Sequence, residues 1–135
     1  MGLDQFAWRV KAEDAIGNFE IAKEEDGSGS KVEEFFHWLK HHDLHGWFER
    51  LYRNKGGPAE SFNCIPVRLT TVDLDALQHD LLNGTLPETT GFFFGNQEYD
   101  EYYFEDLKYT KTLIENLLSN DELMKNWYLE YSSSW

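Results

Sequence analysis

Hydrophobic and polar residues alternate along the first eleven positions of the chain. Phe6, Trp8 and Val10 fall on one side of an extended backbone, while Gln5 and Arg9 fall on the other. Successive side chains of a strand point to opposite faces of its sheet, so this alternation predicts a half-buried strand.

The next segments predict a second strand and two loops. Residues 19–21 carry Phe and Ile in alternation and predict another short strand. Residues 23–30 combine acidic residues with glycine and serine, and predict a flexible acidic loop. A second loop is expected at about residues 54–61, where Gly-Gly-Pro interrupts the pattern. Residues 1–135 otherwise form one domain.

From residue 31 the apolar positions recur at intervals of three and four, which is typical of a helix. Ser30 and Glu33 match a capping box at its start. The residues of this apolar stripe are Val32, Phe35, Phe36 and Leu39. Beyond them the apolar residues spread around the helix surface. We therefore expect either a helix buried on several sides or a break between Asp43 and Gly46.

The middle of the chain predicts a strand followed by a helix. Residues 64–69 are mostly apolar, and Pro66 places them at a sheet edge or at a strand start. Thr70 and Asp73 form a second helix-start pattern, and Gly84 supplies a C-terminal stop. The core-facing stripe of this helix is Leu74, Leu77 and Leu81.

The densest aromatic and acidic run of the chain follows at residues 91–107. Phe92 to Phe94, held between two glycines, predict a short buried strand or turn. Asp100 is expected to cap a helix that ends near Ser119. The core-facing stripe of this helix is Tyr103, Leu107, Thr110, Ile114 and Leu117.

The C-terminal residues predict one more helical turn and a final strand. Asn120 or Asp121 starts the turn, and residues 127–131 alternate as a strand does. Trp135 is expected to dock on the sheet. The order of elements, β-β-α-β-α-(β)-α-β, predicts an α+β fold. We expect a mainly antiparallel sheet of three to five strands with three main helices packed on it, and the first and last strands close together.

Composition limits the classes of partner. The chain has 135 residues, a formal net charge of −13 and 16% aromatic residues. This charge argues against direct binding of nucleic acid and favours a protein with a basic surface. No apolar run is long enough to span a membrane, so no membrane association is expected. The single cysteine, Cys64, excludes an intramolecular disulfide.

Two groups of residues are candidate sites, and neither predicts a catalytic residue. Tyrosines and carboxylates are typical of protein interfaces with basic partners. We therefore predict a partner-binding site that consists of Glu98, Tyr99, Asp100, Glu101 and Tyr102. The histidines at positions 37, 41 and 45 would share one side of a continuous helix. Imidazoles at that spacing bind zinc or nickel, so the alternative site is a metal site of His37, His41 and His45. No other cofactor is expected.

Several motifs carry a resemblance that covers nearly the whole chain. They are Met1-Gly2-Leu3-Asp4, Trp38, Lys40, His45-Gly46-Trp47-Phe48, Asn63-Cys64, Leu86-Pro87, Gly91-Phe92-Phe93-Phe94-Gly95, Glu98-Tyr99-Asp100-Glu101-Tyr102-Tyr103 and Ser133-Ser134-Trp135. With them the chain resembles a group of small bacteriophage and prophage proteins of unknown function, which often carry the label phosphoglycerate kinase. The chain departs from that group at Leu39 and His42, where the group usually has Arg and Asn.

The resemblance implies a phage origin and the host cytoplasm, and it implies no established activity. The kinase label does not fit, because the chain has no glycine-rich phosphate loop. We expect a non-catalytic phage accessory protein that binds and modulates a host macromolecule, in host takeover or anti-defence. The alternatives are a small-ligand binder or sponge for a nucleotide immune signal, an acidic DNA mimic, and a metal-dependent enzyme.

Overall fold

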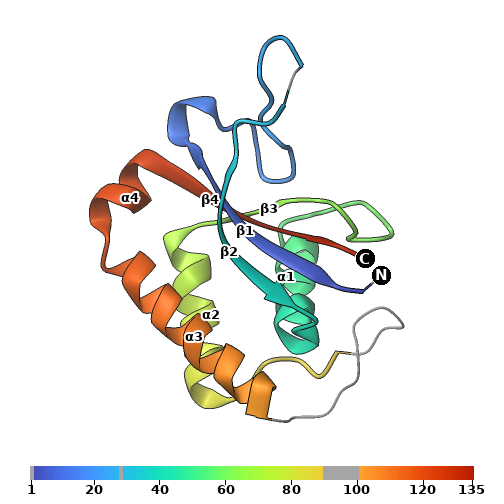
Figure 1. Ribbon diagram of the computed structural model, residues 1–135, viewed down its shortest axis with the longest axis vertical. Helices are drawn as coiled ribbons and strands as arrows, with labels where there is room; N and C mark the ends of the chain where they lie inside the picture. The colour runs from blue at the N-terminus through green and yellow to red at the C-terminus, as the bar shows by residue number, and fades with distance from the viewer. Residues whose placement is uncertain (1, 28, 90–100) are drawn as a thin grey trace.

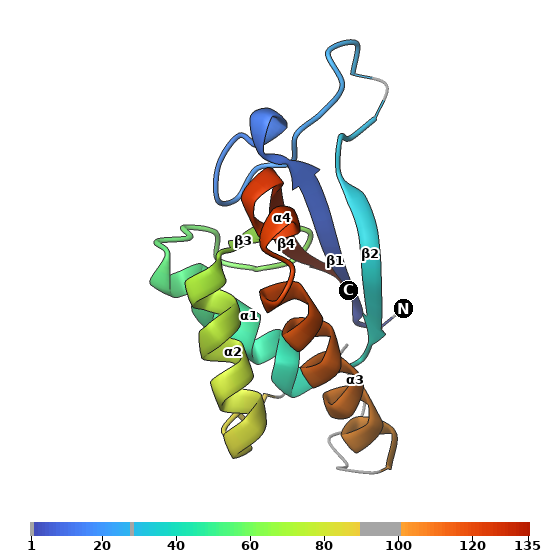
Figure 2. The same cartoon turned by 90° about the vertical axis from the view of Figure 1, so that its left-hand side faces the viewer.

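The computed structural model describes residues 2–27, 29–89 and 101–135. Four antiparallel strands form one sheet in the order β2-β1-β4-β3, and the main helices lie on one side of it (Figures 1 and 2). The strands are β1 (Asp4–Lys11), β2 (Glu33–Leu39), β3 (Val67–Leu69) and β4 (Trp127–Ser134). The helices are η1 (Ala12–Asp14), α1 (His42–Asn54), α2 (Thr71–Asn83), α3 (Glu101–Leu118) and α4 (Asp121–Asn126). The predicted α+β fold with an antiparallel sheet and three main helices is confirmed.

The first and last strands are neighbours along their full length, as the sequence predicts. β1 and β4 pair antiparallel from Asp4 opposite Ser134 to Lys11 opposite Trp127. The two ends of the chain therefore lie side by side (Figure 1). In the segment predicted as a loop, the described residues 23–27, 29 and 30 are irregular apart from one bridge between Lys23 and Ser30.

The core face of β1 is the one that carries Gln5 and Ala7. Both residues are buried, whereas Phe6 and Trp8 are half-buried on the opposite face. Gln5 is tolerated inside because its side chain is fully paired. Its Oε1 accepts a hydrogen bond from the His41 amide at 2.7 Å, and its Nε2 donates to the Tyr131 hydroxyl at 3.1 Å.

The prediction of a helix from residue 31 was wrong for its first half. Glu33–Leu39 form β2, which pairs antiparallel with β1. Aromatic residues pack well on a sheet surface, and pairing with β1 outweighs the helical spacing. The backbone reverses at Lys40, whose φ of 52° ends the strand, and α1 follows. The break thus lies just before the expected interval of Asp43 to Gly46.

Residues 19–21 do not form the second strand that was predicted there. They are irregular, and Phe19 contacts the core from a loop, with its ring 4.8 Å from that of Tyr52. The predicted strand at 64–69 is reduced to β3, which begins directly after Pro66. The expected strand or turn at Phe92 to Phe94 lies outside the described residues.

The two later helices follow their sequence signals closely. Thr70 and Asp73 form the predicted capping box of α2, and Gly84 ends this helix with a φ of 66°. In α3 the buried residues are Thr110, Ile114 and Leu117, as the stripe predicts. Asn120 caps α4 through its side chain. Local sequence signals were sufficient to predict the ends of α2 and the start of α4, because helix capping depends on residues within one turn.

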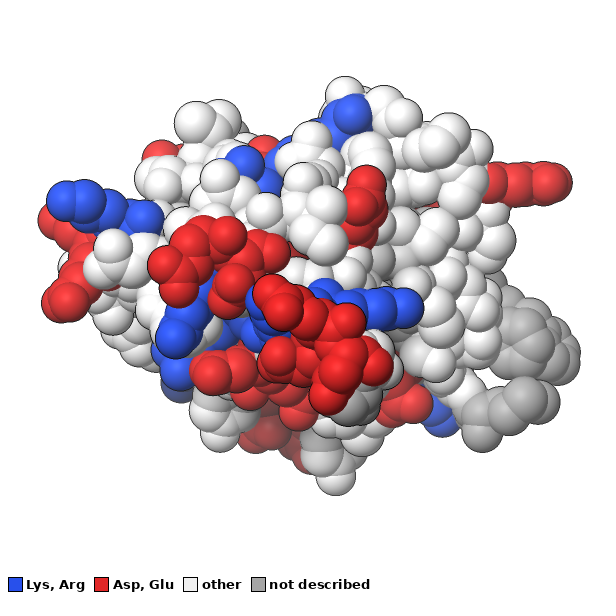
Figure 3. Space-filling view, turned by 90° about the horizontal axis from the view of Figure 1, so that it is seen from above, with Lys and Arg blue, Asp and Glu red and all other residues white. Residues whose placement is uncertain are grey.

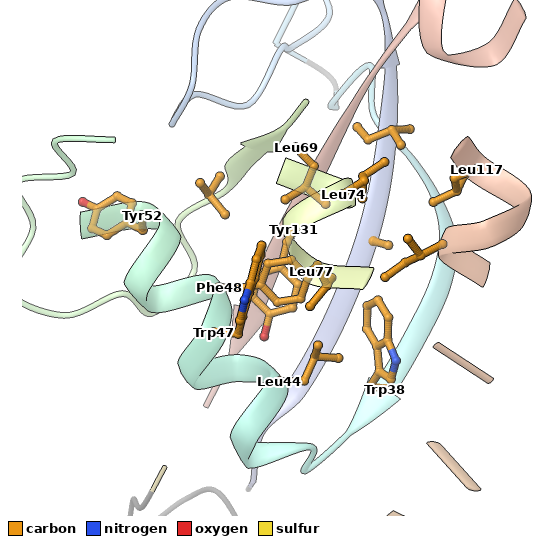
Figure 4. Packing of buried hydrophobic residues seen from close by; sticks show 14 of the residues in the cluster. Trp38, Leu44, Trp47, Phe48, Tyr52, Leu69, Leu74, Leu77, Leu117 and Tyr131 are labelled. Atoms are coloured by element: carbon orange, nitrogen blue, oxygen red, sulfur yellow. The ribbon is translucent and has the colours of Figure 1, made fainter. Parts of the chain in front are cut away.

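The core is an aromatic stack between the sheet and the helices. Phe48 of α1 stacks on Tyr131 of β4 with ring centroids 3.8 Å apart, and Trp38 of β2 packs beside them (Figure 4). Trp135 packs against this core, as expected. Its amide donates a hydrogen bond to Asn63 Oδ1, and its carbonyl accepts one from Asn63 Nδ2.

Acidic residues of η1, of the described part of the loop at 23–30 and of the start of β2 lie at the upper end of the molecule (Figure 1). We call them the upper acidic face; they are Glu13, Asp14, Glu24, Glu25, Asp26 and Glu33. Seen from above, this face carries many carboxylates with Lys and Arg between them (Figure 3). Two of its ion pairs join Arg9 to Glu33 and Lys31 to Asp14. The upper acidic face is therefore partly neutralised.

No helix in the described ranges has the length and apolar character needed to cross a membrane.

Candidate functional site

The three histidines of the predicted metal site do not share a helix face. His37 lies in β2, where it stacks on Phe6 and lies 3.6 Å from an Asp4 carboxylate oxygen. His41 and His45 lie at the start of α1 and are buried. The interpretation of one histidine row was wrong because residues 33–39 form a strand. Across residues 2–27, 29–89 and 101–135, no three His, Cys, Asp or Glu side chains form a group suited to hold a metal ion.

The two buried histidines are part of a polar network inside the core. His45 Nδ1 shares a hydrogen bond of 2.8 Å with the Tyr131 hydroxyl, which also accepts the bond from Gln5. Burial lowers the pKa of His45 to about 4. Burial, with the nearby His42, lowers the pKa of His41 to about 4 as well. Both imidazoles are therefore neutral at physiological pH and serve the packing of α1 on the sheet.

Asp43, in the first turn of α1, joins three segments of the chain. Its Oδ1 lies 2.8 Å from His42 Nδ1 and accepts a hydrogen bond of 2.9 Å from the Thr89 amide. Its Oδ2 accepts a hydrogen bond of 2.8 Å from the Tyr103 hydroxyl. The carboxylate thus ties α1 to the segment after α2 and to the start of α3.

Gly46 allows this junction to close. A Cβ atom at this position would overlap the side chain of Thr89. The absence of a side chain therefore lets residue 89 approach α1 closely enough to reach Asp43.

A pocket opens beside this junction, between the end of α2 and the start of α3. These two ends lie together at the lower end of the molecule, next to the start of α1 (Figure 2). The pocket has a volume of about 330 Å³. Its lining residues are Asp43, Asp80, Leu81, Gly84, Leu86, Tyr103, Phe104 and Leu107, which we call the acidic pocket.

The second carboxylate of the acidic pocket is held in a fixed position. Asp80 Oδ2 accepts a hydrogen bond of 2.8 Å from the Trp47 indole, and Oδ1 accepts one of 2.7 Å from the Thr85 hydroxyl. Partial burial raises the pKa of Asp80, but the hydrogen bonds from Thr85 and Trp47 outweigh it and hold this pKa below its usual value. Asp80 is therefore ionised at neutral pH.

Next to the acidic pocket, α3 presents an acidic and aromatic surface. Tyr102 and Tyr109 expose 69% and 65% of their surface, and Glu101 and Glu105 of the same helix are also exposed. We call these four residues the α3 face. Phe104, 57% exposed, lines the pocket and lies one helical turn from Glu101. Large aromatic side chains at this level of exposure are typical of binding surfaces.

The predicted partner site falls partly on the α3 face. Glu101 and Tyr102 are exposed, as a binding role requires, whereas Glu98, Tyr99 and Asp100 lie outside the described residues. Sequence reasoning missed Asp43, Asp80 and Phe104. Asp43 and Asp80 are 37 positions apart in the chain, and no local motif joins them.

Comparison of the chain with models of known protein families, with curated proteins and with solved structures found no match. The resemblance to phage proteins therefore stays a prediction from the sequence motifs.

Proposed function

We propose that the protein binds a partner protein with a basic surface through the α3 face, and that it does so without catalysis. In the phage setting that the sequence motifs predict, the partner is a host protein whose activity the bound protein modulates. The observation that carries the proposal is the exposure of Tyr102 and Tyr109 together with the carboxylates of Glu101 and Glu105 on α3.

The energetics of protein interfaces support this surface. Tyrosine is enriched among the residues that contribute most to binding, because it buries a large ring at low entropic cost. Two tyrosines seven positions apart lie on the same side of a helix and can contact one partner together.

Charge supports a basic partner over an acidic one. The net charge of −13 attracts a cationic surface during encounter. The carboxylates of the upper acidic face add to this long-range attraction, but ion pairs with Arg9 and Lys31 reduce their part in it. The α3 face combines carboxylates with exposed aromatic area, which gives both attraction and burial.

We predict that the double substitution Tyr102→Ser/Tyr109→Ser weakens partner binding by at least about a hundredfold, since each lost interface tyrosine costs roughly 2 kcal/mol. The partner is captured from bacterial lysate at low salt, identified and purified. Its affinity for each variant is then measured by calorimetry. Both side chains are largely exposed, so the variant should keep the melting temperature of the wild type.

A matched control removes exposed apolar side chains from the neighbouring helix. Val72→Ser/Leu82→Ser acts on two α2 residues that are 75% and 66% exposed and lie outside the α3 face. This control should bind like the wild type. If the tyrosine variant binds its partner at full strength, or if the α2 control loses as much affinity, the α3 face is not the interface.

Two of the alternatives receive less support from the structure. A nucleotide signal carries phosphates, which the carboxylates of Asp43 and Asp80 would repel from the acidic pocket. An acidic DNA mimic needs an unbroken row of carboxylates, whereas cations lie among those of the upper acidic face (Figure 3). Binding to a basic protein agrees with both observations.

A further inference from the structure

We infer that the acidic pocket receives an arginine side chain of the protein partner. This inference rests on the proposed function and names the group that the partner inserts. Phe104 lines the pocket and lies one helical turn from Glu101 of the α3 face. A partner that extends from the α3 face over Glu101 and the exposed ring of Phe104 therefore brings its own side chains to the mouth of the pocket.

The charge of the pocket selects a cation. Asp43 and Asp80 contribute two carboxylates, and the lining residues among those described include no Lys or Arg. Among the described residues, Asp43 pairs with His42 and Asp80 with His79, and neither aspartate forms an ion pair with a Lys or Arg. An added cation would therefore meet negative charge that no lysine or arginine of the described chain neutralises.

The remaining walls of the pocket favour a cation that also has apolar surface. Leu81, Leu86 and Leu107 line it together with the rings of Tyr103 and Phe104. These two rings meet edge to face at a centroid distance of 5.4 Å. Aromatic faces attract cations, and leucine side chains pack well against an aliphatic stem.

Arginine fits this combination better than lysine. Its guanidinium is planar, stacks on aromatic rings and carries several donors that two separate carboxylates can share. The carboxylate oxygens already accept bonds from Thr89, Tyr103, Trp47 and Thr85. They are therefore held in position before a ligand enters, which lowers the entropic cost of binding.

The test uses blocked arginine, N-acetylarginine methylamide, as the probe. The Trp47 indole N–H donates to Asp80, so its NMR resonance reports on the pocket. We expect blocked arginine to shift this resonance in a saturable way, with an affinity higher than that of blocked lysine. Blocked citrulline, which has the same shape without the charge, should cause no saturable shift.

Isosteric substitutions on α2 assign the effect to one carboxylate. Asp80→Asn removes the charge and should weaken arginine binding about tenfold, the loss expected for one charged hydrogen bond. Thr85 can then accept from the new amide, which preserves the local contacts. Asp75→Asn makes the same change at an exposed α2 position outside the pocket and should leave the affinity within about twofold.

A second variant keeps the inference testable if Asp80→Asn loses stability. Phe104→Ser removes an aromatic wall at a largely exposed position and should weaken arginine binding about threefold, the loss expected for one exposed cation–π contact. Equal shifts with citrulline and arginine would overturn the inference. Equal losses in Asp75→Asn and Asp80→Asn would overturn it as well.

Failure here is distinct from failure of the proposed function, because the probe contains no partner protein. If blocked arginine does not bind while Tyr102→Ser/Tyr109→Ser abolishes partner binding, the α3 face stands and the pocket inference falls. If blocked arginine binds while the tyrosine variant keeps its partner, the pocket is a cation site and the proposed interface is wrong.

Discussion

Replacing Phe48 with alanine should lower the free energy of unfolding by about 3–5 kcal/mol, the usual cost of truncating a buried aromatic residue. Phe48 is 1% exposed and stacks on Tyr131, which is itself completely buried. Its removal leaves a cavity between α1 and the central strand β4. Urea unfolding followed by circular dichroism measures the loss.

The matched control for this prediction is Tyr102→Ala, which truncates an aromatic side chain of similar size that is largely exposed. Its free energy of unfolding should stay within about 0.5 kcal/mol of the wild type, as for other surface substitutions. If Phe48→Ala unfolds at the same urea concentration as Tyr102→Ala, the stack of Phe48 on Tyr131 does not hold the core together.

Acidification should destabilise the protein between pH 6.5 and 4.5, by about 2 kcal/mol in net. Burial lowers the pKa of both His41 and His45 to about 4, whereas an unfolded histidine titrates near 6.5. Below pH 6.5 the unfolded state therefore binds more protons than the folded state, and stability falls as the pH decreases. Urea unfolding at a series of pH values measures this slope.

Glu130 acts in the opposite direction and reduces the net loss. It is 3% exposed, and burial raises its pKa to about 7, above the usual 4.5. Between pH 7 and 4.5 the folded state holds a proton that the unfolded state has released, so this group stabilises the fold as the pH falls. Each of the three groups changes the free energy of unfolding by a similar amount, so the two histidines together outweigh the single Glu130.

Substituting Glu130 with glutamine should separate these contributions. The variant should be more stable than the wild type at pH 8 by roughly 2 kcal/mol, because the buried charge is gone. It should then lose about 4 kcal/mol between pH 6.5 and 4.5, since the opposing contribution of Glu130 is gone. Unchanged stability at pH 8 would show that Glu130 carries no buried charge there.

The sequence predicted those parts of the fold that local signals determine. The boundaries of α2 follow from Thr70, Asp73 and Gly84, which act within a single turn of the chain. The proximity of β1 and β4 was also predicted from the sequence, because apolar and polar residues alternate in both segments. The segment Glu33–Leu39 was misassigned since its conformation depends on pairing with β1, more than twenty positions earlier in the chain.

The candidate site was only partly accessible to sequence reasoning. Glu101 and Tyr102 stood out because acidic and aromatic residues adjoin there in the chain. The acidic pocket did not stand out, because Asp43, Asp80 and Tyr103 come from three helices and meet only after packing. Gly46 looked like a helix break, yet it lies inside α1 and provides the space for Thr89.

The position of β4 in the sheet governs the order in which the molecule can be assembled. This strand comes last among those described, yet it lies between β1 and β3 and is the only strand that β3 pairs with. A growing chain must therefore make more than 120 residues before the sheet can close. Contacts between such distant segments slow folding, because a long loop must be ordered first. Until residue 127 has left the ribosome, the edge of β1 that will pair with β4 has no partner strand. At this exposed edge, unfinished chains can pair with one another and aggregate.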